Sequence, residues 1–91
     1  MKLNGILYRI MTEDLNRDQV IKLASKYFDG YSISKPGARS GFWKGQEEAS
    51  LLIEVITSAK NKVMQLANEI KKLNNQESVL VEAIANNAWL V

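Results

Sequence analysis

The feature that most constrains the fold is the order in which two kinds of hydrophobic periodicity follow one another along the chain. Alternating apolar residues, which are typical of strands, occur in residues 3–12, 31–36, 50–57 and 78–85. Helical spacing of apolar residues separates the first two of these segments, and it separates the last two as well. The sequence therefore predicts the order β-α-β-β-α-β, nearly symmetric about the glycine-rich segment 37–45.

The two predicted helices are defined by their apolar stripes. The first stripe consists of Val20, Leu23, Ala24, Tyr27 and Phe28, and the second of Val63, Leu66, Ala67, Ile70 and Leu73. Packed against the inward side of the strands, they predict the following core: Ile6, Tyr8, Ile10, Val20, Leu23, Tyr27, Leu51, Ile53, Val55, Val63, Leu66, Ile70, Val79 and Val81.

Capping residues at both helices refine these boundaries. Asn16, supported by Gln19 three residues later, is the expected N-cap of the first helix, and Ser58 is the expected N-cap of the second. Gly30 is expected to end the first helix in a left-handed conformation. Asn74 and its neighbour Asn75 are expected to end the second helix.

Short connections and right-handed crossovers lead this order of elements towards a ferredoxin-like arrangement. We expect an α+β fold with an antiparallel sheet in the strand order 4-1-3-2 and both helices on one face. Residues 88–91 are expected to form either a short extra strand or a docked tail. The 91 residues are expected to make one domain, residues 1–91, with a thin margin of stability unless association buries more surface.

The face of this sheet that carries no helix has an unusual pattern. Side by side, three strands would present Leu7-Arg9-Met11, Leu52-Glu54-Ile56 and Leu80-Glu82-Ile84. Arg9 would then lie between Glu54 and Glu82, ringed by aliphatic side chains. We interpret this open face as the buried interface of a homo-oligomer, with the charged trio acting as cross-strand ion pairs. The alternative is that the two carboxylates serve acid–base chemistry or anchor a cationic ligand.

The glycine-rich segment is the better candidate for ligand binding. It gathers cations and aromatic rings among residues that let backbone amides approach an anion, and the predicted ligand-binding residues are Lys35, Arg39, Phe42, Trp43 and Lys44. A small anion or nucleotide is the expected ligand. The alternative is a long β-hairpin whose aromatic rings cover the edge of a core or of a neighbouring subunit. Because Phe42 and Trp43 would alternate along a strand, one of them is expected to pack inward.

Composition excludes several classes of chemistry. The chain has no cysteine and no histidine, so thiolate chemistry and histidine-based catalysis are absent, and we predict no metal site, no cofactor and no catalytic residue. A net charge of +2 without a basic cluster argues against nucleic-acid binding. No segment is long and apolar enough for a membrane helix, and a cytoplasmic location is expected by default.

Phe42-Trp-Lys-Gly45, followed by Glu48 and the strand Leu51–Ile56, resembles the CutA-type proteins of the PII-like superfamily. The same stretch, together with residues 76–81, is also similar to a family of small bacterial proteins of unknown function. The PII-like resemblance implies a ferredoxin-like domain, usually a trimer with its sheets turned inward, and nucleotide or metal binding between subunits. Residues 74–77 depart from the His-Pro-Tyr type of segment in CutA proteins, so the metal association does not carry over.

The leading hypothesis is a small homo-oligomeric binding or regulatory protein, with a trimer favoured over a dimer, whose central loop contacts a small anionic ligand at a subunit boundary. The rival hypothesis is a protein-interaction or inhibitor module that uses the loop and Trp89. A third hypothesis, less favoured, is a small enzyme acting on an anionic metabolite through Arg39, Lys44 and Glu48.

Overall fold

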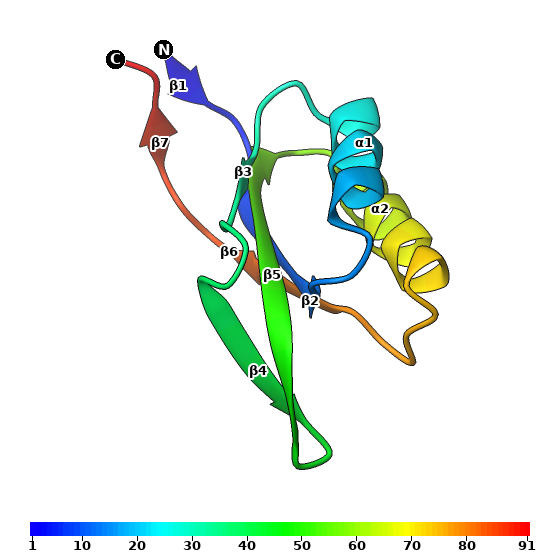
Figure 1. Ribbon diagram of the computed structural model, residues 1–91. Helices are drawn as coiled ribbons and strands as arrows, with labels where there is room; N and C mark the ends of the chain where they lie inside the picture. Colours follow the sequence, from blue (N-terminus) through cyan, green and yellow to red (C-terminus); the bar gives the residue numbers. More distant parts are fainter.

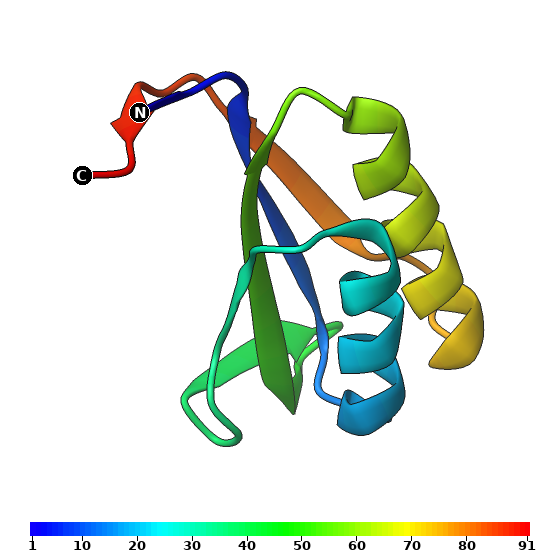
Figure 2. The same ribbon diagram turned by 90° about the horizontal axis from the view of Figure 1, so that it is seen from above.

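The computed structural model describes residues 1–91, in which two helices cover one face of an antiparallel sheet (Figure 1). The frame is made by strands β2 (Ile6–Glu13), β3 (Ser32–Ile33), β5 (Gln46–Thr57) and β6 (Leu80–Ile84) and by helices α1 (Arg17–Tyr27) and α2 (Lys60–Leu73). Three further strands are β1 (Lys2–Leu3), β4 (Arg39–Trp43) and β7 (Ala88–Trp89). Figure 2 shows that both helices lie on the same side of the sheet, which leaves its other face open.

The strand order confirms the predicted ferredoxin-like topology. The sheet runs β3-β5-β2-β6, which is the expected order 4-1-3-2 when the four frame strands are numbered along the chain. Strand β2 pairs with β5 along its whole length, from Ile6 opposite Thr57 to Glu13 opposite Ser50. On its other side β2 pairs with β6, beginning with Leu7 opposite Ile84. β2 is therefore the central strand from which the other registers follow.

The core lies between the helices and the inner face of the sheet. Its buried residues are Tyr8, Ile10, Val20, Ala24, Phe28, Leu51, Ile53, Val55, Val63, Leu66 and Ile70. Of the other predicted core residues, four pack against this cluster while partly exposed, namely Leu23, Tyr27, Val79 and Val81. Ile6 is exposed, and its core assignment is wrong because it sits at the end of the ladder, with a cross-strand neighbour on β5 but none on β6.

Both predicted helix caps are wrong in detail. Asn16 precedes α1 as expected, but it has a left-handed φ of 52° and its side chain makes no capping hydrogen bond. The side chain donates instead to Oδ1 of Asn74, 3.1 Å away. Helix α2 begins after Ala59 rather than Ser58, and the Ala59 amide donates to Oγ1 of Thr57 at 3.0 Å. Gly30 lacks the left-handed conformation predicted for it.

The glycine-rich segment forms a β-hairpin, as the alternative interpretation of this segment predicted. β4 pairs antiparallel with the first half of β5, from Arg39 opposite Ser50 to Trp43 opposite Gln46. Lys44 and Gly45 make the two-residue turn, with φ of 51° and 77°, as the type I′ geometry of such turns requires. Phe42 is 73% exposed and Trp43 48% exposed, so the prediction that one of them packs inward is wrong within a single chain.

The two ends of the chain pair with each other in a separate ribbon (Figure 1). Lys2 lies opposite Trp89 and Leu3 opposite Ala88, so the predicted extra strand within residues 88–91 is present. Its partner β1 was expected to be part of the first long strand, but the chain is interrupted at Gly5. A Cβ at Gly5 would lie 2.5 Å from the carbonyl carbon of Thr57, so only glycine fits this close approach to β5.

Candidate functional site

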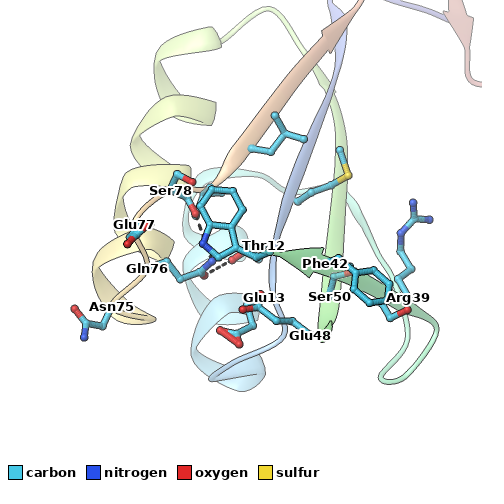
Figure 3. Close-up of a pocket in the computed structure, with 16 residues that line it drawn as sticks. Thr12, Glu13, Arg39, Phe42, Glu48, Ser50, Asn75, Gln76, Glu77 and Ser78 are labelled. Carbon is cyan, nitrogen blue, oxygen red and sulfur yellow. Dashed lines mark hydrogen bonds between the residues drawn. The ribbon is translucent and has the colours of Figure 1, made fainter. Parts of the chain in front are cut away.

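The candidate site is a cleft of about 720 Å³ between the hairpin and the segment that leads into β6 (Figure 3). One wall is β4, residues 39–43, with Glu48 and Ser50 of β5 beside it. The opposite wall is residues 75–80, which join α2 to β6. The end of β2, residues 11–13, forms the floor between them. Three parts of the chain that are distant in sequence therefore meet at one hollow.

Three of the five predicted ligand-binding residues line this cleft, namely Arg39, Phe42 and Trp43. Lys35 does not line it, and Lys44 sits outside it at the tip of the hairpin. The Lys44 ammonium lies 3.1 Å from Oε2 of Glu77, across the mouth of the cleft, and 5.9 Å from the centre of the Trp43 ring. The cation is thus already paired before any ligand arrives.

The charge on the cleft walls limits what the cleft can bind. Arg39 is the cation among the lining residues, whereas Glu13, Glu48 and Glu77 supply three carboxylates. No three carboxylates in the chain come close enough together to hold a metal ion. A highly charged anion would therefore meet repulsion over most of the cleft, and a singly or doubly charged anion placed beside Arg39 would avoid it. Because Arg39 and Glu48 line the cleft but Lys44 does not, the three residues of the enzymatic hypothesis do not meet there.

A polar network beneath the cleft was not predicted from the sequence. The buried Thr12 hydroxyl donates to Oε1 of Gln76, and the buried Asn74 amide donates to the same oxygen at 3.0 Å. The Asn74 amide also lies 3.5 Å from the carbonyl oxygen of Glu13. These contacts fasten the segment after α2 to the end of β2. The sequence signal was the run of amide side chains at residues 74–76, which has no periodicity to reveal its partners.

A second set of contacts fastens the hairpin to the turn between β2 and α1. Arg17 forms a bidentate ion pair with Asp14, in which Nε donates to Oδ1 at 3.1 Å and Nη2 donates to Oδ2. The Asp14 side chain is only 10% exposed, so this pair is largely desolvated. Arg17 Nη1 also donates to the carbonyl oxygen of Ser34 at 2.6 Å. The amide of Asp14 donates to the carbonyl oxygen of Ala49 at 2.8 Å.

The open face of the sheet carries the charged trio in the predicted register. Arg9 lies opposite both Glu54 and Glu82. Its Nε is 3.3 Å from Oε2 of Glu54, and its Nη1 is 3.2 Å from Oε1 of Glu82. These distances agree with cross-strand ion pairs, in which one guanidinium serves two carboxylates.

The aliphatic residues around the trio are unevenly covered. Leu80 is 58% exposed and Ile84 is exposed as well, while Leu7, Met11 and Ile56 are half-buried. Leu52 is only 6% exposed, so this residue of the predicted oligomer interface is already covered within a single chain. At Leu52 the segment after β3 already runs alongside β5, because Ser34 and Leu52 exchange hydrogen bonds of 2.9 Å.

Sequence comparison does not classify the chain. No family model matches it. No curated protein matches it either.

Solved structures with the same fold are found despite low sequence identity. CPII, a nitrogen regulatory PII-like protein from Thiomonas intermedia K12 bound to ADP, AMP and bicarbonate, superposes with a TM-score of 0.70 at 16% identity, covering 100% of this chain and 99% of that one. A putative PII-like signalling protein from Thermus thermophilus gives 0.56 at 21% identity, covering 99% and 91%. The periplasmic divalent cation tolerance protein CutA from Archaeoglobus fulgidus gives 0.56 at 18% identity, covering 99% and 88%. Since such identities show the fold alone, the chain has the ferredoxin-like α+β fold that is shared by PII-like and CutA proteins.

Proposed function

We propose that this chain is a ligand-binding regulatory protein whose cleft takes a small anion bearing a planar ring, with nucleoside monophosphates as the fitting class. The observation that carries the proposal is the wall formed by β4, which places a guanidinium and two aromatic rings along one side of a hollow of about 720 Å³. The hollow is within the size range of small-molecule sites. A structural neighbour, CPII, is bound to ADP, AMP and bicarbonate, which supports the same ligand class.

The chemistry of the walls assigns parts of such a ligand to different residues. A nucleobase can stack on the exposed ring of Trp43, since stacking needs an open aromatic face. The phosphate would lie beside Arg39, whose planar fork suits bidentate contact with phosphate oxygens. The carboxylates of Glu13 and Glu48 would accept hydrogen bonds from amino or ribose hydroxyl groups. A ligand with one phosphate meets fewer like charges than a triphosphate.

The binding experiment is calorimetric titration of the protein with AMP. Replacing Arg39 by glutamine should weaken AMP binding about tenfold or more, because a charge-assisted hydrogen bond to the phosphate is lost. Lys35→Gln is the matched control. Lys35 lies four residues before Arg39 and does not line the cleft, so this change removes one positive charge near the site without altering the cleft walls. Equal losses in the two variants would mean that only net charge matters, and unchanged binding in Arg39→Gln would place the ligand elsewhere.

The proposal includes a homo-oligomer, with a trimer favoured, assembled in the cytoplasm through the open face of the sheet. Exposed Leu80 and Ile84 flank the charged trio there, and such an apolar face on a small domain is typical of an interaction surface. An identical partner is favoured because both carboxylates of the trio already pair with Arg9 within one chain, so a second copy needs mainly to supply apolar surface around them.

A protein-interaction module is the second candidate, and it is favoured by one observation. Phe42 and Trp89 are large aromatic residues that are largely exposed. Their strands, β4 and β7, lie towards opposite ends of the elongated molecule (Figure 1). Exposed aromatic side chains are typical anchors of protein interfaces. Trp89→Ser tests this candidate, because Trp89 does not line the cleft: loss of a co-purifying protein with AMP affinity unchanged would favour the interaction module over the ligand-binding one.

A further inference from the structure

One short segment holds both walls of the cleft. Residues 12–17, here called the bridging segment, run from the end of β2 through the turn into the first residue of α1. Thr12 and Asn16 bond to Gln76 and Asn74 beside one wall. Asp14 bonds to Ala49 in the second strand of the hairpin that forms the other wall, and Arg17 bonds to Ser34, which lies five residues before the first strand of that hairpin. The bridging segment therefore lies between the two walls and is bonded on each side through two residues.

Arg17 is the central contact on the hairpin side. The carboxylate of Asp14 accepts hydrogen bonds from Nε and Nη2 of Arg17. Nη1 of Arg17 is therefore free to donate to the carbonyl oxygen of Ser34. Ser34 in turn exchanges two hydrogen bonds with Leu52 of β5. Residues 35–38 alone separate Ser34, the residue that Arg17 contacts, from the start of β4 at Arg39. A shift of Arg17 would thus be transmitted to the strand that carries Arg39 and Trp43.

On the side of residues 75–80, the contact between Asn16 and Asn74 requires an unfavourable backbone conformation at Asn16. Its left-handed backbone is unfavourable for most side chains, although asparagine tolerates it better than most. Its side chain gives up the usual capping bond to α1 and reaches Asn74 instead. The carbonyl oxygen of Asn16 still accepts a hydrogen bond from the Val20 amide, so only its side chain is diverted from α1. That side chain is better explained by the position of the turn before β6 than by the stability of α1.

We infer that the bridging segment sets the width of the cleft and that Arg17 is a positioning residue for the hairpin wall. Arg17 does not line the cleft, so its effect on a ligand would pass through Ser34 and β4. The effect on binding rests on the function proposed above, whereas the effect on the hairpin does not. Arginine is needed there because a lysine ammonium cannot present the same planar fork to Asp14 and also reach Ser34.

The test compares Arg17→Lys with a control at Lys26. Lys26 belongs to the same helix and pairs with Glu69 of α2, so Lys26→Gln removes a cation and an ion pair without touching the hairpin. Both changes are made in a Trp89→Phe background, which leaves Trp43 as the single tryptophan of the two in the chain. Amide hydrogen exchange is followed separately in residues 39–50 and in residues 53–56, which lie beyond the Leu52 amide that bonds to Ser34, and acrylamide quenching reports the exposure of Trp43.

Arg17→Lys should accelerate exchange in the hairpin about tenfold, since a bond to a charged donor is lost, while residues 53–56 keep their protection. Quenching of Trp43 should rise, and the Kd for AMP should rise with it. Asn16→Gly keeps the left-handed backbone but deletes the bond to Asn74, so it should raise exchange in residues 75–80 and weaken AMP binding independently.

The outcomes separate this inference from the proposed function. Faster hairpin exchange without any AMP binding by the parent protein would support Arg17 as a positioning residue and would overturn the ligand assignment. Hairpin exchange in Arg17→Lys that equals exchange in Lys26→Gln would overturn the positioning role. So would acceleration that spreads uniformly through residues 53–56, because Arg17 would then stabilise the whole fold rather than the hairpin.

Discussion

At the scale of single residues, burial decides how much each side chain contributes to stability. Leu66 is completely buried between α2 and the sheet, whereas Met64, two residues earlier on the same helix, is exposed. Arg17 and Asp14 form the most shielded ion pair, and Lys44 with Glu77 forms an exposed one. Exposed pairs contribute little because water screens them, so Lys44 is better understood through its place at the mouth of the cleft.

Leu66→Ala should lower the free energy of unfolding by about 2–5 kcal/mol, because it removes buried methyl groups and leaves a cavity. Met64→Ala is the control and should change stability by less than about 1 kcal/mol, as expected for an exposed side chain. Urea denaturation of both variants measures the difference. Equal losses would contradict the helical phase that directs Leu66 to the core.

The lowered pKa of Glu69, which lies where α2 faces α1, predicts that the stability of the protein depends on pH. The nearby Tyr27 hydroxyl and the Lys26 ammonium, which donates to Oε1 of Glu69 at 3.2 Å, lower the pKa of this carboxyl from the ordinary 4.5. A carboxyl with a lowered folded-state pKa stabilises the fold above its unfolded pKa, and this contribution is lost as pH falls through the folded value. Stability should therefore decline less steeply below pH 4.5 in Glu69→Gln than in the parent protein. Melting temperatures at pH 3 to 6 test it, and parallel profiles would contradict it.

At the scale of elements, periodicity predicted the frame strands, both helices and their order, because each buries one face and burial imposes a repeat. The hairpin was predicted only as an alternative, since Arg39–Trp43 is exposed on both sides and has no apolar alternation. The side-chain capping bond predicted for Asn16 is absent for a different reason, because the Asn16 side chain donates to the distant Asn74 and makes no bond to the backbone of α1. The cleft combines both problems, because its walls come from an exposed strand and from contacts that are far apart in sequence.

The hairpin turn gives a prediction with a matched pair of glycines. Gly45 has a φ of 77°, whereas Gly30 has no positive φ, and neither would bring a new Cβ within 4 Å of another residue. Gly45→Ala should destabilise the turn by about 1–2 kcal/mol through backbone strain alone. Gly30→Ala should instead stabilise the protein by about 0.4–1 kcal/mol through the unfolded state. Thermal unfolding of both variants distinguishes them, and a shift of the same sign would contradict the type I′ turn.

At the scale of the whole molecule, one face of the sheet is covered by α1 and α2 and the other is left without a layer of its own (Figure 2). Ferredoxin-like sheets of this size gain stability when that second face is also buried, because a small domain hides little surface by itself. Neither α1 nor α2 is both long and apolar enough to cross a membrane. The charged trio of Arg9, Glu54 and Glu82 restricts how a partner can be placed on the open face, whereas a purely hydrophobic surface would not.

Leu80→Asp should convert the proposed oligomer into a monomer, because it places an unpaired carboxylate among the aliphatic residues of the open face. Arg9→Leu should also weaken assembly, since it adds apolar surface but leaves Glu54 and Glu82 without their shared cation. Asp18→Asn on α1 is the control and should leave the mass unchanged. Sedimentation at micromolar concentration measures all three, and a parent protein that sediments as a monomer would defeat the proposal.

The change of partner along β5 has a consequence for variation in chain length. Strand β5 pairs first with β4 and then with β3 on the same side, and residues 35–38 leave the sheet between these two partners. Gly37 stands there in open space, and the Ala38 amide closes a small turn on Lys35. Extra residues inserted at Gly37 would add only a modest loop entropy and would disturb no register. This point is therefore where homologous chains can differ in length, and where a reporter domain can be spliced in while the frame is preserved.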